Sequence, residues 1–147
     1  MVRINGHCYM FGLDKKSWFE SKVACNTKNA YLAKVETPRE NDWIIQQLHA
    51  LSKEFSSIIS FFQHNSFYTK YKLPWIFWIG GNTLRKVGDW KWESTGENIG
   101  YTFFHPTEPN SPTVERCLCY FPDDSNAFYW GDFTCSSKQG YVCEKDN

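Results

Sequence analysis

Six cysteines are the sequence feature that most narrows what this chain can fold into. They occupy positions 8, 25, 117, 119, 135 and 143 of a chain of 147 residues. An even set of cysteines in a small domain favours disulfide bonds, and hence a secreted, extracellular location. A zinc cluster is the rival interpretation, but no CxxC pair occurs, and the Cys117-Leu118-Cys119 spacing suits a strand better than a zinc knuckle. We therefore expect disulfides.

Length and charge limit the organisation of the chain and its partners. A length of 147 residues with 41% hydrophobic residues is enough for a single packed domain over residues 1–147. The formal net charge is zero and Lys and Arg form no cluster, so we expect no nucleic acid partner. No run of 18 apolar residues occurs, so we expect no membrane insertion.

Two capping boxes predict where helices begin, because Ser or Thr followed three residues later by Glu satisfies the amide donors of a first turn. The box at 17–20 predicts a helix that ends near residues 26–29. The box at 37–40 also has a proline at the first helical position. Apolar residues then recur at helical spacing: Ile44, Leu48 and Leu51.

The rest of the chain predicts strands, apart from an insertion at about 52–72 where the apolar period is lost. The aromatic residues of this insertion are either extra core or an exposed contact patch. Two helices combined with short strands indicate an α+β domain. The predicted strands are aromatic or β-branched segments between turn residues, at 7–11, 75–79, 90–92, 117–121, 128–130 and 141–144.

Several motifs in order along residues 7–145 resemble the C-type lectin-like domain family, and their turns are most similar to invertebrate, insect-like members. The resemblance implies two helices, two small antiparallel sheets and a long calcium- and sugar-binding loop region. The motifs are Trp78-Ile79-Gly80-Gly81, Trp90-Lys91-Trp92, Glu108-Pro109-Asn110, Glu115-Arg116-Cys117, Trp130-Gly131-Asp132 and Cys143-Glu144.

The resemblance also implies two disulfides, Cys25 with Cys143 and Cys117 with Cys135. Two cysteines then remain, Cys8 and Cys119. Cys8 corresponds to the second cysteine of an N-terminal hairpin whose first cysteine is absent here, so it is a candidate for linking two chains in a dimer or heterodimer. A bond between Cys8 and Cys119, or a buried thiol, is the alternative, because connectivity cannot be read from sequence.

The same resemblance implies one calcium and sugar site, whose metal and sugar ligands are Glu108, Asn110, Glu115 and Asp132. Ca²⁺ takes six to eight oxygen ligands of this kind. In the family the Glu-Pro bond is cis, and the ligands also hydrogen-bond two adjacent sugar hydroxyls. The loop has Glu at its first position, Glu108, and Asn at its third, Asn110, which resembles mannose-type members. Galactose-type members have Gln and Asp at these two positions. The alternative is an ordinary polar loop with solvated carboxylates.

Two departures from the family pattern concern calcium. Gly131 stands where the family usually has an Asn ligand before the Asp that corresponds to Asp132. We therefore expect calcium and sugar to bind more weakly, and we expect Gly131→Asn to strengthen the binding of both. A second family calcium site is expected to be absent, because residues 82–86 offer Asn82, Thr83, Arg85 and Lys86 in place of acidic ligands.

These features favour a calcium-dependent lectin for mannose-type glycans that acts in innate immune recognition of microbial surfaces through several linked copies. A calcium-independent protein-binding module that has lost sugar binding is the alternative, and Gly131 favours it. We expect no enzyme, because no nucleophile elbow or phosphate loop occurs. No metal-ligand spacing joins the four histidines, His7, His49, His64 and His105.

Overall fold

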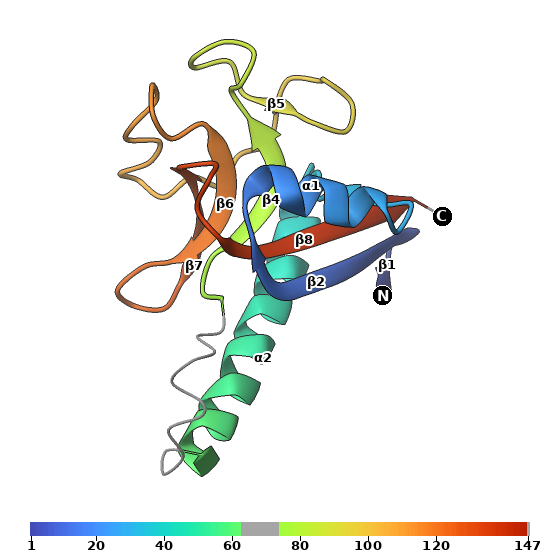
Figure 1. The fold of residues 1–147 in the computed structure, drawn as a ribbon, viewed down its shortest axis with the longest axis vertical. Helices are drawn as coiled ribbons and strands as arrows, with labels where there is room; N and C mark the ends of the chain where they lie inside the picture. The colour runs from blue at the N-terminus through green and yellow to red at the C-terminus, as the bar shows by residue number, and fades with distance from the viewer. Residues whose placement is uncertain (63–73, 147) are drawn as a thin grey trace.

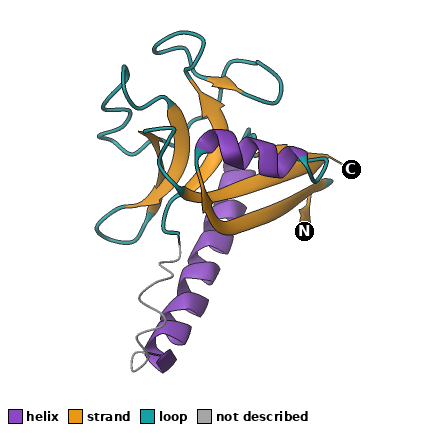
Figure 2. Cartoon of the chain, viewed as in Figure 1, coloured by secondary structure: helices purple, strands orange, loops and turns teal. Residues whose placement is uncertain are grey.

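The computed structural model describes residues 1–62 and 74–146, with the backbone alone over 55–62. Within these residues, two helices pack on a mixed sheet with the strand order β1-β2-β8-β4-β6-β7, while β3 pairs with β8 and β5 with β4 (Figures 1 and 2). The strands are β1 (Val2–Ile4), β2 (His7–Lys16), β3 (Tyr31–Leu32), β4 (Phe77–Asn82), β5 (Lys91–Trp92), β6 (Cys117–Pro122), β7 (Phe128–Phe133) and β8 (Gln139–Asp146), and the helices are α1 (Trp18–Asn26) and α2 (Pro38–Phe62).

The sheet confirms the predicted α+β class and shows how its two halves are joined. β4 and β8 pair in parallel, with Phe77 opposite Gly140 and Trp78 opposite Tyr141. All the other strand pairings are antiparallel among the residues described. The two antiparallel sheets implied by the family resemblance are therefore one continuous mixed sheet. Two short strands, β1 and β3, were not predicted from the sequence.

Both predicted helix starts are confirmed. The Glu20 amide donates to Ser17 Oγ over 3.1 Å and the Ser17 amide donates to Glu20 Oε1 over 3.2 Å, which closes the first capping box. α2 begins at Pro38 after Thr37, whose Oγ1 accepts from the Glu40 amide over 3.2 Å. No helix in the described part of the chain is long and apolar enough to cross a membrane.

The predicted insertion is helical in its first half, which the sequence did not predict. α2 continues without a break to Phe62, and Figure 1 shows it extending well past the sheet. Residues 63–72 of the insertion lie outside the described residues, as do the side chains of its aromatic residues. The expected core or contact patch of these aromatic residues therefore falls outside the described part of the chain.

Trp130 is the centre of the larger part of the core. Its indole is fully buried and contacts the rings of Trp92, Tyr101, Phe104 and Tyr120. Asn41 of α2 is also fully buried, and its Oδ1 accepts from the Tyr120 hydroxyl over 2.7 Å and from the Trp130 indole over 3.1 Å. These two hydrogen bonds tie α2 to β6 and β7, which lie below the loop region.

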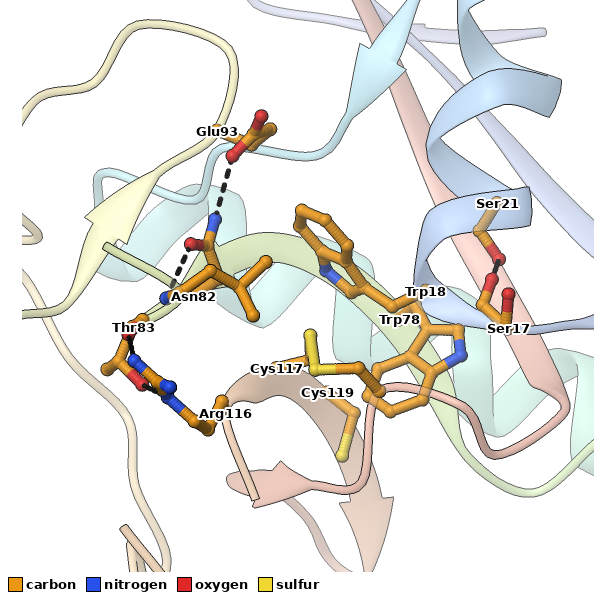
Figure 3. The surroundings of a disulfide bond; sticks show 12 residues. Ser17, Trp18, Ser21, Trp78, Asn82, Thr83, Glu93, Arg116, Cys117 and Cys119 are labelled. Atoms are coloured by element: carbon orange, nitrogen blue, oxygen red, sulfur yellow. Dashed lines mark hydrogen bonds between the residues drawn. A yellow bond between two sulfur atoms is a disulfide. The ribbon is translucent and has the colours of Figure 1, made fainter. Parts of the chain in front are cut away.

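The second part of the core contains the two disulfides that the family resemblance implied. Cys25–Cys143 joins α1 to β8, and Cys117–Cys135 joins β6 to the turn after β7. Figure 3 shows the indoles of Trp18 and Trp78 beside the Cys117 side chain. Cys8 and Cys119 belong to neither disulfide and are not bonded to each other, and Cys119 is fully buried.

The two disulfides are expected to contribute unequally to stability. Their sequence separations are 118 and 18 residues, and a cross-link restricts the unfolded chain more when it closes a longer loop. We predict that the pair Cys25→Ala and Cys143→Ala lowers the free energy of unfolding by about 5 kcal/mol, and the pair Cys117→Ala and Cys135→Ala by about 3 kcal/mol. Urea titration of both double variants checks this order. Equal losses, or a larger loss for the shorter loop, would contradict it.

Candidate functional site

The four predicted ligands come from two segments that meet beside β7. Glu108, Asn110 and Glu115 lie in the loop before β6, and Asp132 lies on β7. The Asn110 amide donates to Asp132 Oδ1 over 3.1 Å, and the Ser111 amide donates to Asp132 Oδ2 over 3.2 Å. Asp132 is only 1% exposed, so these two amides hold its carboxylate at the base of the loop. The sequence did not single out Ser111, whose contact with Asp132 is made by its backbone amide.

Glu108 has one carboxylate oxygen occupied and one without a partner. The Asn110 side-chain amide donates to Glu108 Oε1 over 3.0 Å. Glu108 Oε2 is buried and has no hydrogen-bond partner. The Glu108–Pro109 peptide is cis, as predicted. A buried, unpaired carboxylate oxygen is costly unless a cation or a donor occupies the adjacent space.

The carboxylates of Glu108, Glu115 and Asp132 repel one another. Burial, the contact with Asp132 and the negative charges of Asp132 and Glu115 raise the pKa of Glu108 to about 7. Burial and the charge of Asp132 also raise the pKa of Glu115. Arg116 does not neutralise the group, because its guanidinium donates to the carbonyl of Thr83 and, over 3.4 Å, to its hydroxyl. The cluster therefore favours a bound cation.

The donor set fits calcium. Three carboxylates and one amide side chain offer hard oxygen atoms, which Ca²⁺ prefers, and no nitrogen or sulfur ligand is among them. Glu108 Oε2 is the strongest sign of this fit, because it is an acceptor already removed from water. The same groups could hydrogen-bond the hydroxyls of a ligand.

Gly131 lies under an aromatic ring, which the sequence did not predict. A Cβ atom at this position would lie 2.8 Å from Cε1 of Phe121 and 3.4 Å from Cγ of Glu108. Its backbone is not in the positive-φ region. The obstacle to an Asn side chain is therefore the Phe121 ring and not backbone strain. Gly131 pairs with Cys119, and Phe121 lies two residues further along the same face of β6, so this contact depends on the register between β6 and β7.

Partly buried aromatic rings continue from Phe121 along this side of the site. The His105 ring lies 5.8 Å from that of Phe121 and 5.0 Å from that of Tyr129, and Phe103 stacks on Tyr129 at 5.5 Å. His105 Nδ1 accepts from the Thr107 amide over 3.2 Å. The predicted site thus has an acidic centre and an aromatic border.

The loop after β4 uses its polar atoms within the protein. Asn82 is buried, its amide donates to Glu93 Oε2 over 3.0 Å, and its Oδ1 accepts from the Leu84 amide over 3.1 Å. Figure 3 shows Thr83 facing Arg116 in the same region. Asn82 is therefore used within the protein, and the expected absence of a second calcium ion at this loop stays a prediction.

Comparison with known proteins identifies the family. The model of the lectin C-type domain matches residues 14–145. A perlucin-like protein from Mytilus galloprovincialis is 27% identical over 138 residues, which are 93% of this chain and 75% of that protein. Another curated relative is the C-type mannose receptor 2 of Homo sapiens, and this chain covers only 8% of its length.

Solved structures share the fold. The C-type lectin domain of murine dendritic cell inhibitory receptor 2, in complex with N-glycan, is 24% identical with a TM-score of 0.73, covering 99% of this chain and 95% of that one. The Ca²⁺-independent C-type lectin SPL-2 from Saxidomus purpuratus is 23% identical with a TM-score of 0.74, covering 98% and 89%. At these identities the likeness concerns the fold alone.

The raised pKa of Glu108 predicts a pH-dependent stability in the absence of metal. The native state keeps the Glu108 proton up to about pH 7, whereas the unfolded chain loses it near pH 4.5, so stability falls as the pH rises between these values. Glu108→Gln removes this loss. In chelator, we expect the variant to exceed the parent by about 1 kcal/mol at pH 8, after allowance for solvent screening, and to match it at pH 5. Thermal and urea unfolding at both pH values measure the difference, and parallel profiles would contradict the prediction.

Proposed function

This chain belongs to the C-type lectin domain family, and we propose that it is a calcium-dependent lectin that binds mannose-type glycans through Glu108, Asn110, Glu115 and Asp132. Members of this family are non-enzymatic carbohydrate-binding proteins. The observation that carries the proposal is the buried, unpartnered Glu108 Oε2 within a cluster of three carboxylates.

Calcium is the cofactor that these residues would hold. Bound there, the ion would offset the repulsion among the carboxylates and polarise the hydroxyls of a sugar. The protein contributes a fixed set of acceptors, because Asp132 is held by two backbone amides and Glu108 by the Asn110 side chain.

The proposed sugar class rests on the resemblance of this loop to mannose-type members, and the donors and acceptors of the loop are compatible with it. Glu108 offers carboxylate oxygens as acceptors, and the exposed Asn110 side chain offers an amide donor. The order Glu-Pro-Asn resembles members that bind vicinal equatorial hydroxyls, as in mannose. Weak single sites of this kind bind more strongly when several linked copies bind together, which suits the repeated glycans of a microbial surface. We therefore propose that this disulfide-bonded protein is secreted and recognises microbial surface glycans outside the cell.

The second candidate function is a calcium-independent protein-binding module of the same fold that has lost sugar binding. Gly131 lacks the side-chain oxygen that the family motif has there, and Phe121 occupies the adjacent space. A fold neighbour, SPL-2, is described as Ca²⁺-independent. In that case the carboxylate cluster would bind no ion, and the aromatic border would be the contact surface.

Affinity on immobilised sugars separates the two candidates. We predict retention on mannose resin in calcium, release by chelator, and no retention on galactose resin. The paired change Glu108→Gln and Asn110→Asp should transfer retention to galactose, because it exchanges the acceptor and donor positions of the loop. Asp124→Asn, on the exposed turn between β6 and β7, is the matched control and should change nothing. Failure of the parent to be retained on either resin would support the calcium-independent module, and retention that persists in chelator would contradict calcium-dependent binding.

The steric contact over Gly131 predicts how the missing ligand can be restored. Gly131→Asn alone must displace the Phe121 ring, so we no longer expect it to strengthen binding by itself. Combined with Phe121→Ala, the added amide has room, and we predict about fivefold tighter mannose binding than for Phe121→Ala alone, as expected for one further hydrogen bond. Titration calorimetry with mannose compares the four proteins, and a thermal melt confirms that each is folded. A gain from Gly131→Asn alone, equal to that of the double variant, would show that Phe121 is no obstacle.

A further inference from the structure

The first residue of β2 and the end of β8 bring three metal-ligating side chains together. His7 pairs directly with Asp146, and Glu144 lies two residues earlier on the same face of β8. His7 Nδ1 lies 2.9 Å from Glu144 Oε1 and 3.1 Å from Asp146 Oδ1, and the ligand atoms of the three residues lie within 4.8 Å of one another. The sequence hid this group, because its members come from opposite ends of the chain.

The three ligand atoms converge without being hydrogen-bonded to one another. The His7 side chain is 41% exposed, yet its Nδ1 atom is buried and has no hydrogen-bond partner. The 2.9 and 3.1 Å contacts therefore lack the angles of a hydrogen bond, although their lengths suit an ion pair. Tetrahedral ligands at about 2.0–2.2 Å from one zinc ion are about 3.3–3.6 Å apart. The two contacts of His7 Nδ1, at 2.9 and 3.1 Å, are a few tenths of an ångström shorter, so a small outward movement of these side chains would place them around a common ion.

The remaining contacts hold the two carboxylates, and among the described residues His7 is their one basic partner. Glu144 is 2% exposed, and its Oε2 accepts from the Lys34 amide over 2.8 Å. Asp146 Oδ1 accepts from the Tyr31 hydroxyl over 2.8 Å. The Lys34 ammonium lies with Glu36 and Glu97, at 3.4 and 3.0 Å, and not with this group.

The environment of Glu144 favours an added positive charge. Burial, and to a lesser extent the negative charge of Glu40, raise the pKa of Glu144 to about 7. The carboxylate of Glu40 accepts one hydrogen bond from the Tyr9 hydroxyl and another, over 2.9 Å, from the Glu36 backbone amide. A divalent cation next to Glu144 would stabilise its ionised form.

We propose that His7, Glu144 and Asp146 form a binding site for a divalent transition metal ion such as zinc. One imidazole nitrogen with two carboxylate oxygens suits zinc, whereas calcium prefers oxygen ligands only. Three protein ligands leave a fourth position for water or another group. The site is separate from the proposed sugar site, because Figure 1 places the paired ends of β2 and β8 beside the chain termini, away from β6, β7 and their loops.

Metal titration of the intact, untagged chain in saturating calcium tests the proposal. We expect one zinc ion per chain by calorimetry, visible absorption from cobalt bound at the same site, and a melting temperature that rises with zinc because the ion links β2 to β8. His7→Gln and Asp146→Asn should each weaken zinc binding ~tenfold or more. Asp146 is chosen in preference to Glu144 because its side chain is 67% exposed, so its replacement does not disturb the core.

Matched variants distinguish this site from other ligands and from the sugar site. His105→Gln, Cys8→Ser and Glu108→Gln should bind zinc like the parent. His7→Gln should keep the mannose binding of the parent, whatever that binding proves to be, so the two proposals can fail separately. Absence of zinc binding, unchanged binding by His7→Gln, or its loss in Cys8→Ser would overturn the assignment.

Discussion

The burial of Trp130 is the constraint on which the candidate site depends. Its indole is enclosed by aromatic rings and donates a hydrogen bond to Asn41 of α2. These contacts fix the position of β7 relative to the core. The backbone of Trp130 then fixes the loop above, because its amide donates to Phe103 and its carbonyl accepts from His105 over 2.9 and 3.0 Å. Asp132 follows two residues later and is positioned against the Asn110 amide.

The site combines a rigid base with unfavourable charge. The two disulfides and the packed indoles restrict β6, β7 and β8, while the acidic side chains of Glu108 and Glu115 are held close to Asp132 at a cost in free energy. A scaffold that is stable elsewhere can retain such strain, and strained or repulsive groups are common where a ligand binds. The same reasoning applies to Glu144 at the opposite end of the sheet, where a buried carboxylate faces His7.

Local signals and the family resemblance predicted much of the fold, whereas contacts between distant segments were not predictable. The capping boxes located both helix starts, and the resemblance implied the cis Glu108–Pro109 bond and both disulfides. The extension of α2 was missed because its polar residues obscure the helical period. The Phe121 ring over Gly131, and the approach of His7 to Glu144, each depend on strand register, which a single sequence does not specify.

A crystal structure of the chain with calcium and methyl α-mannoside tests the central claim most directly. The account predicts one calcium ion at the loop before β6, with oxygen ligands from Glu108, Asn110, Glu115 and Asp132, and two vicinal sugar hydroxyls completing its coordination. A sugar bound without calcium, or a calcium ion bound away from these four residues, would contradict it.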